Sequence, residues 1–171
     1  MRILPKSALA IATAVAVAGG APATGQVSNP NALKAAIVFN IMRYVEFPGK
    51  PASQPITLCA LRGAAGSGEF AGLNGQRAGN RQVLYRSFDG SSATGCDAVF
   101  IGNGDSADIA RVRQRGTLVF GDGGGFTSAG GTVGLVRTGA QIRFEINLRT
   151  ANETGVTISS HLLRLASRTV R

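Results

Sequence analysis

The only histidine of the chain, His161, directly follows two serines, Ser159 and Ser160. A serine hydroxyl next to an imidazole is the pair with which many hydrolases attack a carbonyl carbon, the imidazole acting as general base. The surrounding pattern predicts a helix, however, and consecutive residues of a helix project about 100° apart, so the three side chains do not converge. The chain also lacks the G-x-S-x-G motif of many such enzymes. We therefore predict no catalytic residues and no enzymatic activity, and a hydrolase stays an alternative without a recognisable site.

The other residue types offer little to a metal or a nucleotide. One imidazole and two cysteines that we expect to pair do not make a four-ligand metal set. The glycines of LRGAAGSGEF (61–70) are spaced as G-x-x-G-x-G, and GDGGGF (121–126) lacks the Lys-Ser/Thr of a phosphate-binding loop. We predict no metal and no cofactor, and interpret both segments as turns that need positive φ. The second segment follows a predicted parallel strand, where α/β sheets usually bind ligands, so a mobile rim of a binding site is its alternative.

The first residues have the pattern of a secretory signal peptide. Arg2 and Lys6 precede an apolar run over residues 8–18, and small residues suited to cleavage follow at 21–23. The run is short for a membrane span, and an uncleaved N-terminal anchor is the alternative. We expect an exported protein with a signal peptide at residues 1–23, a flexible N-terminus at 24–31 and a single domain at 32–171.

Lysine and arginine outnumber the acidic residues by 18 to 9 in the chain of 171 residues. Removal of the expected signal peptide takes away two basic residues and leaves a balance of +7. Such a surplus attracts nucleic acid, anionic lipid or an acidic partner. The arginines are spread along the whole chain, tryptophan is absent and an exported protein seldom meets DNA. We therefore exclude nucleic acid as a partner and interpret the surplus as a solvated basic surface.

Two cysteines, Cys59 and Cys96, remain in the exported chain. Each belongs to an apolar run, ITLCAL (56–61) or CDAVFIG (96–102), of the kind that forms buried strands. An even number of cysteines in an oxidising compartment indicates a disulfide, here one that joins two neighbouring strands near their ends. Loop entropy gives such a bond a value on the order of 4 kcal/mol. Two unpaired buried thiols are the alternative.

Predicted helices and strands alternate along the chain. Asn29 and Pro30 are typical of a helix start, and we expect this first helix to end at Phe47, because a residue before proline is pushed out of the α region. Its apolar residues at helical spacing are Leu33, Ile37, Ile41, Tyr44 and Val45. The other expected elements are strands at 56–61, 81–88, 97–102 and 116–122, two strands about a Thr138-Gly139 turn, a short helix at 69–75, a helix at 106–115 capped by Ser106, and a closing helix beyond Gly155 with Ile158, Leu162 and Leu165 on its core stripe.

This alternation predicts an α/β fold, a single three-layer α/β/α sandwich with a mostly parallel sheet and an antiparallel C-terminal hairpin. In the second strand of the hairpin, alternate residues fall on opposite faces. The apolar face holds Ile142, Phe144, Ile146 and Leu148, and the polar face holds Arg143, Glu145 and Asn147. The polar face is either solvated or a contact surface.

Five segments resemble, in the right order, the successive blocks of the YfiR-like family of bacterial periplasmic proteins. The resemblance covers about residues 32–166, and its most specific parts are the RFEIN strand and the ISS-x-LLRLA helix. It implies a three-layer α/β sandwich, a homodimer and a strand-to-strand cysteine pair that matches Cys59 and Cys96. A second cysteine pair, found in some members in the glycine-rich region, is absent here. The segments are LKAAIVFNIMRYVEFPG, ITLCAL, CDAVFIG, LVFGDGGGFTSAGGTVGLV and IRFEINLRTANETGVTISSHLLRLA.

The resemblance implies a non-enzymatic periplasmic regulator. In the better understood members, the protein binds the periplasmic sensory domain of an inner-membrane diguanylate cyclase of the YfiN type and represses it, which lowers cyclic di-GMP and biofilm formation. An outer-membrane lipoprotein can sequester the repressor. The alternative is a periplasmic module that binds a small ligand or a partner and serves a different sensor, such as a histidine kinase or an outer-membrane receptor or transporter, with the glycine-rich rim as its pocket.

Two pairs of charged residues are our candidates for partner binding. The first is Glu145 with Arg143, on the polar face of the RFEIN strand. We expect Glu145→Lys to abolish repression if the pair lies at an interface, because a charge reversal there is costly. An internal ion pair that ties the strand to a helix is the alternative. The second pair is Arg43 and Glu46, on the exposed side of the first predicted helix.

Overall fold

The structure is a computed structural model that describes residues 29–171. The expected signal peptide at 1–23 lies outside the described residues, as do residues 24–28. The helices are α1 (Pro30–Met42), α2 (Ser67–Ala71), α3 (Ser106–Val112), α4 (Leu148–Thr154) and α5 (Ser160–Leu165). The strands are β1 (Val45–Glu46), β2 (Ile56–Leu61), β3 (Arg77–Ala78), β4 (Arg81–Phe88), β5 (Ala98–Phe100), β6 (Leu118–Asp122), β7 (Val133–Thr138), β8 (Gln141–Asn147), β9 (Thr157–Ile158) and β10 (Arg168–Val170).

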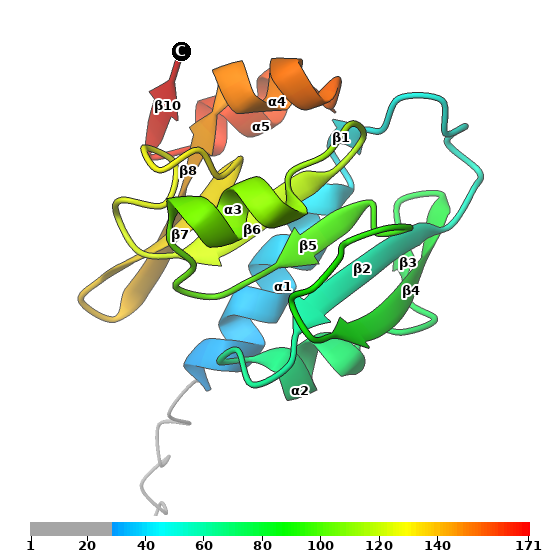
Figure 1. Cartoon of the computed structure of the whole chain (residues 1–171), viewed down its shortest axis with the longest axis horizontal. Helices are drawn as coiled ribbons and strands as arrows, with labels where there is room; N and C mark the ends of the chain where they lie inside the picture. The colour runs from blue at the N-terminus through cyan, green and yellow to red at the C-terminus, as the bar shows by residue number, and fades with distance from the viewer. Residues whose placement is uncertain (1–28) are drawn as a thin grey trace, which may run out of the picture.

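Eight strands form one sheet in the order β10-β8-β7-β6-β5-β2-β4-β3 (Figure 1). The five strands from β7 to β4 in this order are parallel to one another. At one end of the sheet β8 runs antiparallel to β7, and at the other end β3 runs antiparallel to β4. The predicted mostly parallel sheet with an antiparallel C-terminal hairpin is therefore confirmed, and the hairpin turn is Gly139-Ala140, one residue beyond the expected one.

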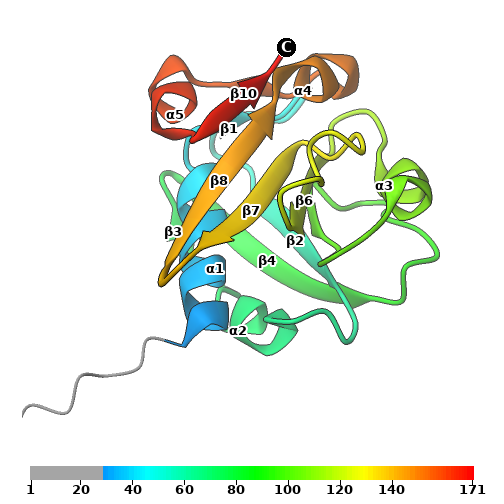
Figure 2. The ribbon, with the colours of Figure 1, turned by 90° about the vertical axis from the view of Figure 1, so that its left-hand side faces the viewer.

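Each face of the sheet has its own hydrophobic core, so the fold has three layers. On one face α1 and α2 cover the larger core, which includes Leu58, Phe100 and Ile146. On the other face α3 covers a smaller core, which includes Val99 and Phe126. Figure 2 shows α1 and α3 on opposite sides of the strands. The predicted α/β/α sandwich is confirmed, because strands that are apolar on both faces need cover on both.

The first helix begins as predicted but ends earlier. Asn29 caps it by accepting a hydrogen bond from the Asn31 N–H at 3.0 Å, and Pro30 is its first residue, so the expected flexible segment at 24–31 is helical at its end. The helix stops at Met42 instead of Phe47. The proline rule sets only the last position that a helix can reach. Here β1 leaves the helix sooner because it pairs with β9, and that pairing is a tertiary contact.

Two other expectations about helices were wrong. Asp105, and not Ser106, caps α3, because its carboxylate accepts from the N–H groups of Ala107 and Asp108. The expected single closing helix is the series β9, α5 and β10, and α4 precedes it. Within α5, Leu162 is buried as predicted, but Leu165 is 58% exposed. The short C-terminal strand pairs with β8, which removes the last residues from the helix.

The glycine-rich segment between β6 and β7 is packed around one phenylalanine. Phe126 is buried, and its ring lies against Gly121 on β6 and Gly131 just before β7. A Cβ atom on either glycine would overlap this ring. The segment predicted to be a glycine-rich turn or a mobile rim is thus anchored to the α3 face of the sheet, and two of its glycines are required by packing.

We expect Gly131→Ala to destabilise the fold by roughly 1–3 kcal/mol or more, because the added methyl group must displace the buried Phe126 ring. Gly125→Ala is the matched control, since no atom lies within 4 Å of the position of its Cβ and its φ is not positive. Urea denaturation of both variants checks this. Equal stabilities of the two variants would show that the ring is not confined by Gly131.

Candidate functional site

The structure separates the two predicted partner-binding pairs. On β8, Ile142 and Phe144 pack toward the core under α1, so Arg143 and Glu145 face the α3 side. Arg43 follows the last residue of α1, and Glu46 is in β1, on the α1 side of the sheet. The sequence left both an interface and an internal ion pair open for Arg143 and Glu145, and it placed Arg43 and Glu46 on the exposed side of the first helix. The structure puts the two pairs on opposite faces of the sheet. One partner must therefore reach around the sheet edge to contact both.

Glu145 forms an ion pair within the chain. Its carboxylate accepts a hydrogen bond from Arg168 Nη2 at 2.6 Å and another from Thr127 Oγ1 at 3.0 Å. Arg168 stands directly opposite Glu145 in the parallel β8–β10 register, so the two side chains are cross-strand neighbours. The Glu145 side chain is only 12% exposed. This matches the alternative of an internal pair, with the difference that it ties two strands together instead of a strand to a helix.

The ion pair alters the acid–base properties of Glu145. The hydrogen bond from Arg168 is the main cause that lowers the pKa of Glu145 below its ordinary value of 4.5, burial acts in the opposite direction, and the Thr127 hydrogen bond also lowers it. Thr127 belongs to the glycine-rich segment, and its Oγ1 also accepts from Arg168 at 3.1 Å. The three side chains therefore connect that segment to the C-terminal strand.

The other members of the polar face have different environments. Arg143 is exposed and donates to Gln141 Oε1 at 3.1 Å, so it does not pair with Glu145. Asn147 is buried, donates to the Thr127 carbonyl at 2.8 Å and caps α4. The predicted polar face is thus solvated at one end and covered at the other, because the segment that contains Thr127 folds over it.

Arg168 and Thr127 were missing from the sequence-based candidates. Arg168 follows the region that the sequence pattern assigns to the closing helix. Its partner lies 23 residues earlier in the chain, and no local pattern connects residues so far apart. The β-branched Thr169 and Val170 beside it favour a strand and were the one available signal.

The Ser159–Ser160–His161 segment has structural roles. Ser159 Oγ caps α5 by accepting from the Leu162 N–H at 3.2 Å. The His161 ring lies 5.1 Å from the Tyr44 ring, between centroids, and is tilted by 36°. The two side chains are thus engaged with different neighbours. Within residues 29–171, no group of three or more His, Cys, Asp or Glu side chains is placed to hold a metal ion.

An apolar groove lies where α1, β8 and α5 meet. Only some of the apolar residues that predicted the first helix face the core, and Leu33 and Tyr44 are more than a third exposed. Tyr44 and the exposed Leu165 line a hollow of about 190 Å³. The hollow is lined by Ile37, Asn40, Ile41, Tyr44, Ile142, Phe144, Leu162 and Leu165. Exposed apolar side chains at a hollow with a mostly apolar lining are typical of a protein contact.

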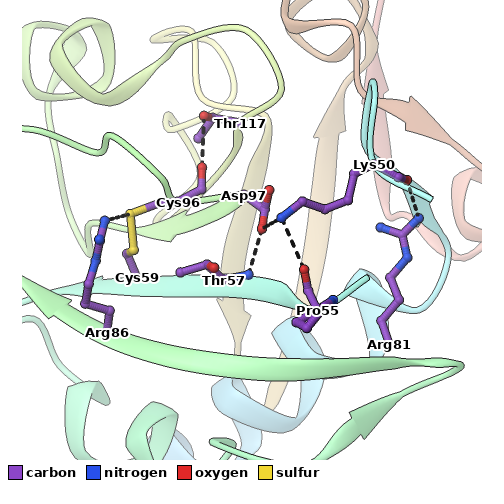
Figure 3. A network of polar contacts seen from close by, with 9 residues as sticks. All are labelled: Lys50, Pro55, Thr57, Cys59, Arg81, Arg86, Cys96, Asp97 and Thr117. Atoms are coloured by element: carbon purple, nitrogen blue, oxygen red, sulfur yellow. Dashed lines mark hydrogen bonds and ion pairs between the residues drawn. A yellow bond between two sulfur atoms is a disulfide. The ribbon is translucent and has the colours of Figure 1, made fainter. Parts of the chain in front are cut away.

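The disulfide between Cys59 and Cys96 joins β2 to the residue just before Asp97 and β5, with Cα atoms 5.8 Å apart. Next to it, Asp97 Oδ2 accepts from Lys50 Nζ at 2.5 Å and from the Thr57 N–H at 2.7 Å (Figure 3). The predicted disulfide is therefore present. In the loop-entropy model its closed loop is worth about 4 kcal/mol.

The Glu145–Arg168 pair predicts a pH-dependent stability. A carboxylate whose pKa is lowered by folding stabilises the native state above its unfolded pKa of 4.5, and this stabilisation is lost as the pH falls through the lower folded value. We expect Glu145→Gln to lower the melting temperature by a few degrees at pH 7. The difference from the wild type should shrink below about pH 4.5. A difference that is constant from pH 7 to pH 3 in thermal melts would contradict the pairing.

Two solved structures share this fold. The crystal structure of a conserved domain protein from Vibrio cholerae O1 biovar El Tor has a TM-score of 0.53 at 14% identity and covers 82% of this chain and 60% of that chain. The structure of an ABC domain in complex with L-Trp from Streptococcus pneumonia has a TM-score of 0.53 at 13% identity and covers 83% of this chain and 61% of that chain. The chain thus spans about 60% of the length of each. At such low identity the likeness concerns the fold alone.

Three further findings concern related sequences, membrane-spanning helices and the protein family. No curated protein sequence matches the chain. Across residues 29–171, no helix combines the length and apolar character that a membrane crossing needs. A family model described as YfiR/HmsC-like matches residues 31–167, which confirms the resemblance found in the sequence. The protein belongs to the YfiR/HmsC-like family.

Proposed function

We propose that this protein is a periplasmic regulator that binds the periplasmic sensory domain of an inner-membrane diguanylate cyclase and represses it. Membership of the YfiR/HmsC-like family over residues 31–167 is the observation that carries the proposal. The Cys59–Cys96 disulfide supports a location in an oxidising compartment such as the periplasm. Repression lowers cyclic di-GMP and, with it, biofilm formation.

The proposed mechanism is binding without a catalytic step. Ser159 Oγ is occupied by the cap of α5, and the His161 ring lies against Tyr44, so neither side chain is arranged as a nucleophile or its base. The protein acts by holding the cyclase domain in an inactive conformation. Repression then depends on the difference in affinity between the inactive and the active conformation of that domain.

We propose the groove between α1, β8 and α5 as the surface that contacts the cyclase domain. Its exposed residues include Leu165 and Tyr44, and aromatic and arginine side chains often dominate binding energy at interfaces. The exposed charged residues next to these two in the chain are Arg43 and Arg164, both basic. This charge favours an acidic surface on the partner. Glu46 lies beside Arg43 along a second hollow of about 210 Å³, and this pair belongs to the proposed contact surface.

Arg143 and Glu145, on the opposite face of the sheet, have a different role from that of the groove. Arg143 is exposed and available to a partner, whereas Glu145 already contacts Arg168 and Thr127. We propose that Glu145 acts on repression by holding β10 in place. We also propose a homodimer and sequestration by an outer-membrane lipoprotein, and the family membership is the support for both.

We expect Leu165→Glu to prevent repression, because it places a charge in the apolar groove while a side chain that is 58% exposed contributes little to folding. Leu84→Glu is the matched control, since Leu84 is also exposed, at 42%, but lies on β4 away from the groove. Each variant replaces the chromosomal copy, and cyclic di-GMP and co-purification with a diguanylate cyclase are measured. The regulator proposal fails if deletion of the gene leaves cyclic di-GMP unchanged and no diguanylate cyclase co-purifies with the wild type.

A charge exchange separates the two possible roles of Glu145. We expect Glu145→Lys to lose repression, because it places two positive charges in contact on β8 and β10. The double variant Glu145→Arg/Arg168→Glu restores the internal pair and should recover most of the repression if Glu145 positions β10. Recovery of the melting temperature without recovery of repression would instead indicate that Glu145 touches the partner directly.

A further inference from the structure

A further cavity lies at the opposite end of α1 from Arg43 and Glu46. Its volume is about 420 Å³, within the range of small-molecule pockets. The first turns of α1, the residues that follow β2, β5 and β6, and the β7–β8 hairpin enclose it. The groove at the junction of α1, β8 and α5 shares only Ile142 with it. Its polar lining consists of Asn31, Lys34, Asn103, Asp122 and Arg137.

The sheet topology places this cavity where α/β sheets bind ligands. The parallel strands occur in the spatial order β4-β2-β5-β6-β7, so the order reverses between β2 and β5. Ligands of open α/β sheets bind beyond the carboxyl ends of the strands near such a reversal. Ala65 follows β2, Asn103 follows β5 and Asp122 ends β6, and all three line the cavity.

One acceptor in the cavity wall has no partner. Asp122 Oδ2 pairs with Lys34 Nζ at 2.7 Å, and the Asp122 side chain is only 12% exposed. Its second oxygen, Oδ1, is buried without a hydrogen bond to any of residues 29–171. A buried acceptor without a hydrogen bond costs free energy of folding. A donor in the cavity reaches Oδ1 only when the carboxylate turns about its Cβ–Cγ bond, and rotation about this bond of an aspartate is soft.

The net positive charge of the cavity lining favours an anionic ligand. Two of its three ionisable side chains, Lys34 and Arg137, are positive and one, Asp122, is negative. Arg137 donates through Nε to the Gly139 carbonyl at 3.2 Å, and no partner for its terminal nitrogens is found among residues 29–171. The N-terminus of the 13-residue α1 also borders the cavity and adds partial positive charge.

We propose that this cavity binds a small carboxylate that also carries hydroxyl groups. The carboxylate contacts Arg137 and the start of α1, and a hydroxyl group donates to Asp122 Oδ1. Asn31 and Asn103 offer side-chain amides, which both donate and accept, for further hydroxyl groups. The site goes beyond the regulator function, because repression through the groove does not require a ligand here, and the two can fail independently.

Three six-carbon probes test this chemistry by isothermal titration calorimetry with the full mature protein. D-gluconate carries a carboxylate and hydroxyl groups, hexanoate carries only the carboxylate, and D-glucitol carries only hydroxyl groups. We expect saturable binding of gluconate with a Kd of about 1 mM or below. Hexanoate and glucitol should bind at least about tenfold more weakly, since each lacks one of the two contacts. Absence of gluconate binding, or equal binding of all three probes, overturns the proposal.

Variants locate the binding to the cavity. Asp122→Asn keeps the shape but removes one acceptor, and Arg137→Gln removes the charge of an exposed side chain. Each should weaken gluconate binding at least about tenfold. Arg143→Gln is the matched control, because Arg143 is exposed on the same hairpin but does not line the cavity. Unchanged gluconate binding in Arg137→Gln, or an equal loss in Arg143→Gln, contradicts the site even if Asp122→Asn fails to fold.

Discussion

The register between β2 and β5 is the constraint on which the rest of the structure depends. β2 is an interior strand of the sheet, and the strand order reverses between it and β5. The Cys59–Cys96 disulfide links the two segments, and Asp97 binds both Lys50 and the backbone of Thr57. Parallel strands are far apart in sequence, so their pairing carries a loop-closure cost before any contact is gained. A covalent link and a shared carboxylate at this point offset part of that cost.

From this pair of strands the sheet extends in both directions, and α1 borders a different surface at each of its two ends. The β2–β5 reversal leaves the carboxyl ends of the strands open beside the start of α1, where Lys34 and Asp122 meet. At the other end of α1, the helix stops early because β1 pairs with β9, which brings α5 against Tyr44. The same helix therefore borders a polar cavity at one end and an apolar groove at the other.

The glycine-rich segment illustrates how packing gives a role to residues that a pattern interprets only as a turn. Gly121 and Gly131 leave room for the buried ring of Phe126. The anchored segment then holds Thr127 over β8, where it meets Glu145 and Arg168. A chain without a second cysteine pair in this region thus fixes the segment through a buried aromatic ring and a three-residue polar cluster.

The amino-acid sequence was enough to predict the fold class, the start of α1 and the family, because these depend on local periodicity, capping residues and contiguous motifs. It also indicated the disulfide, because the exported chain has two cysteines. It did not determine that β10 exists, that Glu145 pairs with Arg168, or that Asp122 has an unpaired oxygen beside a cavity. Those features join residues that are tens of positions apart in the chain, and no periodic pattern encodes such a distance. These features follow from the folded chain, because strand pairing and burial determine which side chains meet and which remain at the surface.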